Sequence, residues 1–169
     1  VIIIALIISA VLATFISWQT ACAFVLGSCM SALAGWCGMK AATYANVRVA
    51  NTALKTNSLS GTLKNTFKGG SVMGLCVGGF ALLGIFIVYL VFGIWMGQID
   101  AILSGQSAVN WIGLSAPFTM TVSGYALGCS VIAMFARVGG GIYTKAADMG
   151  ADLVGKTEAG IPEDDPRNP

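Results

Sequence analysis

Four long apolar stretches alternate along the chain with shorter polar segments. They cover residues 1–17, 20–46, 69–97 and 113–136. Each is near or above the roughly 20 residues that an α-helix needs to cross a bilayer. The pattern predicts an all-α fold, a polytopic membrane helix bundle with four transmembrane helices in one transmembrane domain.

The polar connections differ in charge, and this difference predicts their side of the membrane. Segments 17–20 and 97–111 contain no Lys or Arg, whereas all nine basic residues lie in 40–68 or from Arg137 onward. Basic residues accumulate on the cytoplasmic side of membrane proteins. We therefore expect 47–68 and 137–169 to be cytoplasmic and Asp100 to lie outside.

The second and third apolar stretches are expected to continue as helices beyond the membrane. The Ala-rich sequence after Lys40 runs to Lys55 without a proline, and residues 58–61 contain Ser and Gly, which are typical of turns. Segment 58–61, with Gly61 as a turn residue, is the expected tip. Helices of this length would support a site above the membrane surface.

Composition excludes several classes of protein. Of the 169 residues, 56% are hydrophobic and 9% are charged, whereas soluble domains carry about 25% charged residues. The net charge of +2, without a basic cluster, argues against nucleic-acid binding. The first residue already lies inside an apolar run and the last ones lie in a charged, Pro-rich segment, so we expect a piece of a longer protein.

Cysteine and glycine spacing indicates packing rather than chemistry. The five cysteines form no C-x-x-C pair, so neither a zinc site nor a disulfide framework is predicted. Small residues recur every four positions, which lets membrane helices approach closely. These positions are Gly27/Ser31/Gly35, Gly70/Gly74/Gly78 and Gly124/Gly128.

Charged residues return at helical spacing after the fourth apolar stretch. At about 100° per residue they fall on one side of a continuous helix. They are Arg137, Lys145, Asp148, Asp152 and Lys156. Two carboxylates four residues apart repel each other, so the aspartates suggest a bound cation. Mg²⁺ is commonly held by one or two carboxylates plus substrate phosphates, and the lysines would hold phosphate oxygens.

Alternatives remain open for these residues. The segment is also compatible with a solvated helical extension in which Asp152 pairs with Lys156. Arg137 lies at the inner edge of the fourth stretch, where an ionisable group either serves a function or reaches for the membrane interface. Residues 139–141, three glycines, would break the helix, line a phosphate-binding nest of backbone N–H groups or admit a neighbouring helix.

One long motif gives these residues a context. The run GGGIYTKAADMGADLVGKTEAGIPEDDPRNP at 139–169 resembles the signature of membrane-bound pyrophosphatases, the ion-pumping inorganic pyrophosphatases. Segments 38–50, 69–84 and 121–141 resemble corresponding parts of the same family. The resemblance covers essentially the whole chain.

The resemblance implies a role for each residue. Lys145 corresponds to a pyrophosphate-binding lysine, Asp148 and Asp152 to Mg²⁺ ligands, and Arg137 to the region that couples hydrolysis to ion transport. The site border would comprise Lys156, Glu158, Glu163 and Asp164. The water-activating aspartates of the family lie on later helices, so no catalytic residue is expected in this chain, and alone it would be inactive.

The resemblance also implies the function of the whole protein. Such proteins are homodimeric pumps of about sixteen helices that couple hydrolysis of Mg²⁺-bound pyrophosphate to sodium or proton transport. The motif is closest to the prokaryotic, potassium-dependent, sodium-pumping branch, so K⁺ is an expected activator and the prokaryotic plasma membrane the expected location, or an internal acidic compartment in a eukaryote. The alternatives are a secondary transporter or channel subunit that binds a cation without hydrolysis, and a structural bundle that docks a partner.

Overall fold

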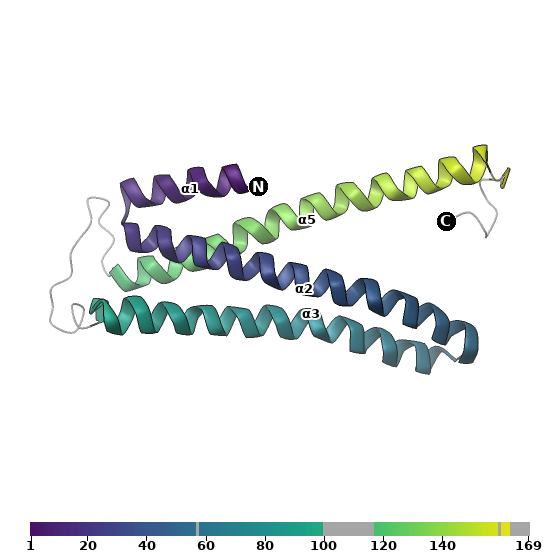
Figure 1. The fold of residues 1–169 in the computed structure, drawn as a ribbon, viewed down its shortest axis with the longest axis horizontal. Coiled ribbons are helices and arrows are strands. Elements are labelled where there is room, and N and C mark those ends of the chain that lie inside the picture. Colours follow the sequence, from purple (N-terminus) through teal and green to yellow (C-terminus); the bar gives the residue numbers. More distant parts are fainter. Residues whose placement is uncertain (57, 100–116, 159, 163–169) are drawn as a thin grey trace. The chain divides into compact units, whose positions relative to one another are not determined.

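Helices account for all the regular structure in the residues that the structure describes. The computed structural model describes residues 1–56, 58–99, 117–158 and 160–162. The elements are α1 (Ile2–Phe15), α2 (Trp18–Thr56), α3 (Leu59–Val88), the π-helical η1 (Tyr89–Trp95) and α5 (Pro117–Thr157) (Figure 1). The prediction of an all-α polytopic membrane fold is confirmed.

Three of the described helical segments are long and apolar enough to cross a membrane. They are Trp18–Thr56, Leu59–Trp95 and Phe118–Thr157. Helix α1 has 14 residues, fewer than the roughly 17 that a crossing requires. The expected spans 20–46 and 69–97 lie within α2 and α3–η1, while 113–116 and Asp100 lie outside the described residues. The four-span topology stays a prediction.

Helices α2 and α3 lie side by side and antiparallel (Figure 1). Both continue far beyond the apolar stretches, as predicted, and near their connection Asn65 Nδ2 donates to Thr52 Oγ1 at 2.8 Å. The turn is shorter than expected. Ser58 is the N-cap of α3 and its carbonyl accepts from Thr62 N at 3.2 Å, so Gly61 lies in the first helical turn rather than at the tip.

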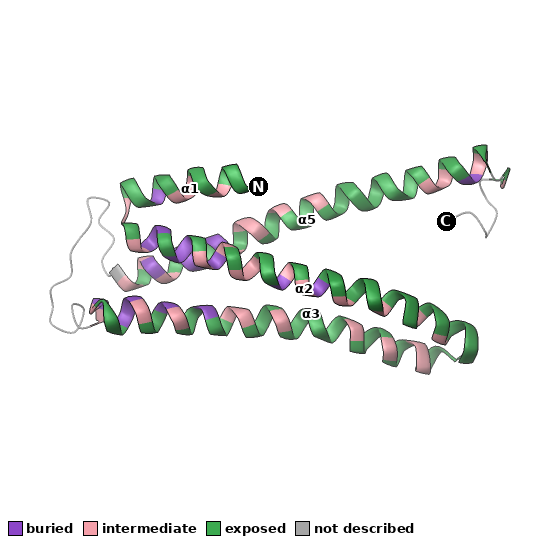
Figure 2. Cartoon of the chain, viewed as in Figure 1, coloured by how far each residue is buried: buried purple, intermediate pink, exposed green. Residues whose placement is uncertain are grey.

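The described chain forms two compact units. The first comprises Val1–Ala133 and contains α1, α2, α3, η1 and the beginning of α5, and the second starts at Met134. Buried residues of the first unit concentrate at one end of α2, in η1 and in the first turns of α5 (Figure 2). They form two clusters, one of Ala23, Val88, Phe92 and Tyr125 and one of Leu12, Ala21 and Phe24.

Glycines bring α2 and the first turns of α5 into backbone contact. A Cβ added to Gly128 would meet the Phe24 carbonyl group and lie 3.0 Å from Ser28 N, and one added to Gly27 would meet the Tyr125 carbonyl. Ser31 Oγ donates to the Cys129 carbonyl at 3.1 Å. The predicted packing role of Gly27, Gly124 and Gly128 is confirmed, whereas an added Cβ at Gly70, Gly74 or Gly78 meets nothing within 4 Å.

Buried polar groups join the same helices. Tyr125 OH, which belongs to α5, donates to the Phe80 carbonyl of α3 at 3.1 Å. Thr121 Oγ1 donates to Gln98 Oε1 at 3.2 Å. Because a polar group in an apolar environment is costly without a partner, these bonds favour one arrangement of α3 and α5 over others.

Candidate functional site

The predicted charged stripe lies on one unbroken helix. Helix α5 is helical from Pro117 to Thr157, so the three glycines at 139–141 do not interrupt it. In the described part of the chain, a Cβ added at any of these glycines would meet nothing within 4 Å. The continuous helix places Lys145, Asp148 and Asp152 on one side of the second unit, as their spacing predicts.

The carboxylate pair is partly neutralised by a lysine. Lys156 Nζ lies 2.8 Å from Asp152 Oδ2, and the two side chains are 33% and 37% exposed. Asp148 is exposed. An i,i+4 ion pair of this kind contributes only about 0.3–0.5 kcal/mol. The pair expected for a solvated helix is therefore present, but it is weak enough for Asp152 to exchange Lys156 for a divalent cation.

The remaining cations of the stripe are exposed on the same helix. Lys145 lies one turn before Asp148, and Arg137 lies two turns before Lys145. At 1.5 Å per residue, Arg137 is about 16 Å along the axis from Asp148. One helical segment thus carries the proposed substrate ligands and, well separated from them, the residue expected to take part in coupling.

The chain turns sharply after the stripe. Glu158 N donates to the Val154 carbonyl at 2.9 Å, Ile161 N donates to the Gly155 carbonyl at 3.0 Å, and Gly160 adopts a φ of 61°. Glycine tolerates this left-handed conformation, which commonly ends helices. Glu158 therefore stays next to the stripe, whereas Glu163 and Asp164 lie outside the described residues.

The donor set fits a metal that is shared with a substrate. Among the described residues, no three His, Cys, Asp or Glu side chains gather into a group that could hold a metal ion. Asp148 and Asp152 thus supply two hard oxygen ligands from this part of the chain. Mg²⁺ retains several waters and accepts phosphate oxygens, so two carboxylates beside two lysines suit magnesium-bound phosphate.

A hollow elsewhere in the molecule does not suit this ligand. A cavity of about 400 Å³ between α2 and α3 is lined by small, apolar and uncharged polar residues, among them Gly38, Ala42, Asn46 and Met73. Its lining offers no charge to a phosphate. The sequence did not point to this cavity, because it arises from how two separate helices pair.

A family model and several relatives match the chain. The model described as "Inorganic H+ pyrophosphatase" matches residues 1–169. A "K(+)-stimulated pyrophosphate-energized sodium pump" of Thermotoga maritima is 62% identical over 167 residues, which cover 98% of this chain and 23% of that protein. The chain thus spans about a quarter of that relative's length.

Two further relatives differ in the ion that their names state. A "Putative K(+)-stimulated pyrophosphate-energized sodium pump" of Clostridium tetani is 49% identical over 163 residues, which cover 96% of this chain and 20% of that protein. A "K(+)-insensitive pyrophosphate-energized proton pump 2" of Moorella thermoacetica is 46% identical over 166 residues, which cover 98% of this chain and 22% of that protein.

Proposed function

The chain belongs to the inorganic H⁺ pyrophosphatase family, and from this premise we propose that it is part of a membrane pump driven by pyrophosphate. The pump would couple hydrolysis of Mg²⁺-bound pyrophosphate to the transport of Na⁺ or H⁺. The chain is an integral, multi-pass membrane protein. The higher identity to a relative named as a K⁺-stimulated sodium pump supports Na⁺ as the transported ion and K⁺ as an activator.

One observation carries this proposal, namely that α5 is a single helix which leads from an apolar stretch to a stripe of two carboxylates and two lysines. In the proposal, Lys145 binds a phosphate oxygen, and Asp148 and Asp152 hold Mg²⁺. Lys156 either neutralises Asp152 or moves to a second phosphate oxygen. The bound Mg²⁺ would neutralise phosphate charge as the leaving group departs.

The task of these residues is positioning and electrostatics. Phosphoryl transfer needs little covalent help from the protein and depends on fixed charges around the phosphate oxygens. The residues that activate the attacking water are proposed to lie on other helices of the longer protein, so this chain alone would not hydrolyse pyrophosphate. A homodimer in the plasma membrane is part of the same proposal.

Neutralising Asp148 tests the proposed site. In the full-length protein, we expect Asp148→Asn to lower kcat/KM for pyrophosphate by about 100-fold, the usual order when a preorganised charge is removed from a reaction site. The measurement is phosphate release by protein in vesicles at several Mg²⁺ concentrations. Pyrophosphate-dependent ²²Na⁺ uptake in the same vesicles should fall in parallel.

A matched variant keeps this test specific. Val154→Leu changes the opposite side of the same helical region, is uncharged and lies at an exposed position, so activity should persist. Normal turnover and an unchanged Mg²⁺ requirement in Asp148→Asn would contradict the proposed site. Cation uptake that does not depend on pyrophosphate would instead favour a secondary transporter or channel.

A further inference from the structure

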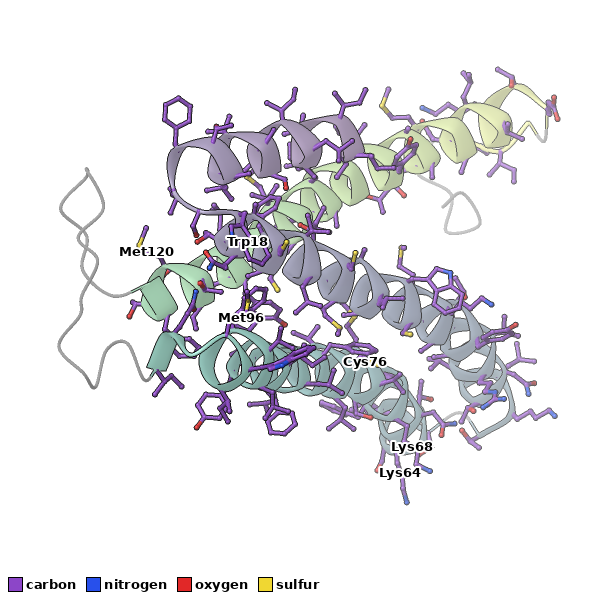
Figure 3. The ribbon with its side chains drawn as sticks, turned by 60° about the vertical axis from the view of Figure 1, so that its left-hand side comes forward. Trp18, Lys64, Lys68, Cys76, Met96 and Met120 are labelled. Atoms are coloured by element: carbon purple, nitrogen blue, oxygen red, sulfur yellow. The ribbon has the colours of Figure 1, made fainter. Side chains whose placement is uncertain are left out.

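An exposed face of α3 carries two lysines one helical turn apart. Lys64 and Lys68 are both exposed, and Figure 3 shows their side chains extending outward from α3. Phe67, between them, is 75% exposed. Like charges at this spacing destabilise a helix, so the pair is expected to have an anionic partner.

That partner is not provided by the neighbouring helices of this chain. The sequence contains no Asp or Glu before Asp100, so α1, α2, α3 and η1 have no carboxylate at all. Neither lysine can form a salt bridge with the helices that precede or follow it in the hairpin. The anion must come from elsewhere, either from lipid or from another part of a longer protein.

The lysine face continues along α3 as large apolar side chains. Leu75, Leu82 and Phe86 are 75%, 73% and 59% exposed. At about 100° per residue, all three fall within about 40° of Lys64 and Lys68 around the helix axis. Ser71 lies in the same direction, but its hydroxyl donates to the Lys68 carbonyl at 2.9 Å and needs no further partner.

This face differs from the one that packs helices in this chain. Helices α2 and α5 meet through Gly27, Gly124 and Gly128, whose missing side chains allow backbone contact. Small residues are what membrane helices use for close packing, whereas exposed leucine and phenylalanine have the same polarity as acyl chains. The leucine face of α3 is therefore suited to lipid.

The charged end of this face lies where lipid headgroups would be. Lys68 directly precedes Gly69, at which the apolar stretch begins, and Leu75 follows about 10 Å further along the helix. Lysines at such positions extend toward the phosphate layer. The expected cytoplasmic side is also where anionic lipids attract basic residues.

From these observations, we propose that Lys64 and Lys68 bind the headgroup of an anionic phospholipid whose acyl chains lie along Leu75, Leu82 and Phe86. We choose lipid over a carboxylate of the same protein because charge and apolar surface continue on one helical face at the depth that a phospholipid requires. The inference does not depend on pyrophosphate, so hydrolysis and lipid binding can fail separately.

Site-specific photocrosslinking tests the proposal. The full-length protein would carry benzoylphenylalanine in place of Leu75, in vesicles of equal parts phosphatidylglycerol and phosphatidylcholine whose acyl chains differ in mass. After illumination, the masses of the lipid adducts identify the headgroup. We expect phosphatidylglycerol adducts to exceed phosphatidylcholine adducts by about fivefold or more, since each lysine near an anionic surface contributes about a fivefold preference.

Matched variants assign this preference to the two lysines. Lys64→Gln with Lys68→Gln should bring the adduct ratio down to that of the bulk lipid, and Lys64→Arg with Lys68→Arg should keep it high. Lys55→Gln, at the exposed end of α2, should leave it unchanged. Benzoylphenylalanine at the buried Phe24 should crosslink to protein rather than to lipid.

Several results would overturn the inference. Crosslinks from position 75 to protein would mean that another helix covers this face, for example at the open Gly78 and Gly79. Equal adducts of the two lipids would remove the headgroup preference. A preference that survives the double glutamine variant would show that other groups bind the headgroup.

Discussion

At the scale of single residues, the most informative group is the pair Asp152 and Lys156 beside Asp148. The 2.8 Å ion pair is what a solvated helix would show, and it also keeps the two aspartates from repelling each other at full strength. Because an exposed pair contributes only a few tenths of a kcal/mol, it does not compete with a divalent cation. The contact is compatible with a resting arrangement of a metal site.

Comparing the two partners distinguishes these roles. In the full-length protein, we expect Asp152→Asn to raise the Mg²⁺ concentration for half-maximal hydrolysis by about 10-fold or more, because an oxygen ligand is lost. Lys156→Gln should change this concentration little. The measurement is a Mg²⁺ titration of phosphate release at saturating pyrophosphate.

The comparison is decisive because the two changes break the same ion pair. If Asp152 served only to pair with Lys156, both variants would behave alike and the Mg²⁺ requirement would stay constant. That outcome would restrict the proposed metal ligands to Asp148 and to groups outside this chain.

At the scale of elements, the glycines of α2 and α5 decide which helices touch. Gly27 and Gly128 allow backbone contact between the two helices, and Ser31 and Cys129 add hydrogen bonds across the same contact. Gly35, in the same helix as Gly27, has nothing within 4 Å of an added Cβ in the described chain. The same residue type therefore has different structural weight at positions two turns apart.

A pair of alanine substitutions tests this difference. Gly128→Ala should lower stability by about 1–3 kcal/mol, the usual cost of overpacking, because the Phe24 carbonyl group belongs to a helix backbone and cannot move aside. Gly35→Ala should leave stability unchanged or slightly raise it. Thermal unfolding of the full-length protein in detergent measures both, and equal losses would contradict the crossing described here.

The sequence predicted helices and faces better than it predicted partners. The 3.6-residue period and the apolar lengths anticipated α2, α3 and the stripe on α5, because these depend on local spacing. It did not reveal that Gly128 meets Phe24 whereas Gly74 is open, or that Tyr125 bonds Phe80, because these facts depend on the packing of distant segments. The expected tip at Gly61 was wrong because α3 begins at Leu59.

The candidate site divides along the same line. Local spacing was sufficient to place Asp148, Asp152 and Lys156 on one side of a helix. The ligands that would complete a metal site could not be predicted, since they must come from residues far away in sequence. Within the described residues, two carboxylates are all that α5 contributes near Lys145.

At the scale of the whole molecule, the chain is one part of a larger membrane protein family. It covers 20–23% of the length of the three relatives reported above, and its charges lie where the positive-inside rule expects the cytoplasm. Its proposed contribution is to connect a phosphate site with the membrane through α5. Arg137 is the residue on which that connection would depend.

Replacing Arg137 tests the connection. We expect Arg137→Gln in the full-length protein to reduce the Na⁺ or H⁺ transported per pyrophosphate hydrolysed by about fivefold or more, the lower range of typical coupling between sites. Arg137→Lys should retain part of the coupling because it keeps the charge. Ion uptake and phosphate release are measured in the same vesicles, and an unchanged ratio would reduce Arg137 to an interfacial residue.

The unbroken course of α5 through three successive glycines has a mechanical consequence. As long as this segment stays helical, Arg137 and Asp148 are fixed points on one lever, and a shift at either end is felt at the other. The lever has a soft joint, since each glycine weakens the helix by about 1 kcal/mol relative to alanine. Motion of the phosphate end would thus be passed on stiffly until the load exceeds what these three residues can bear.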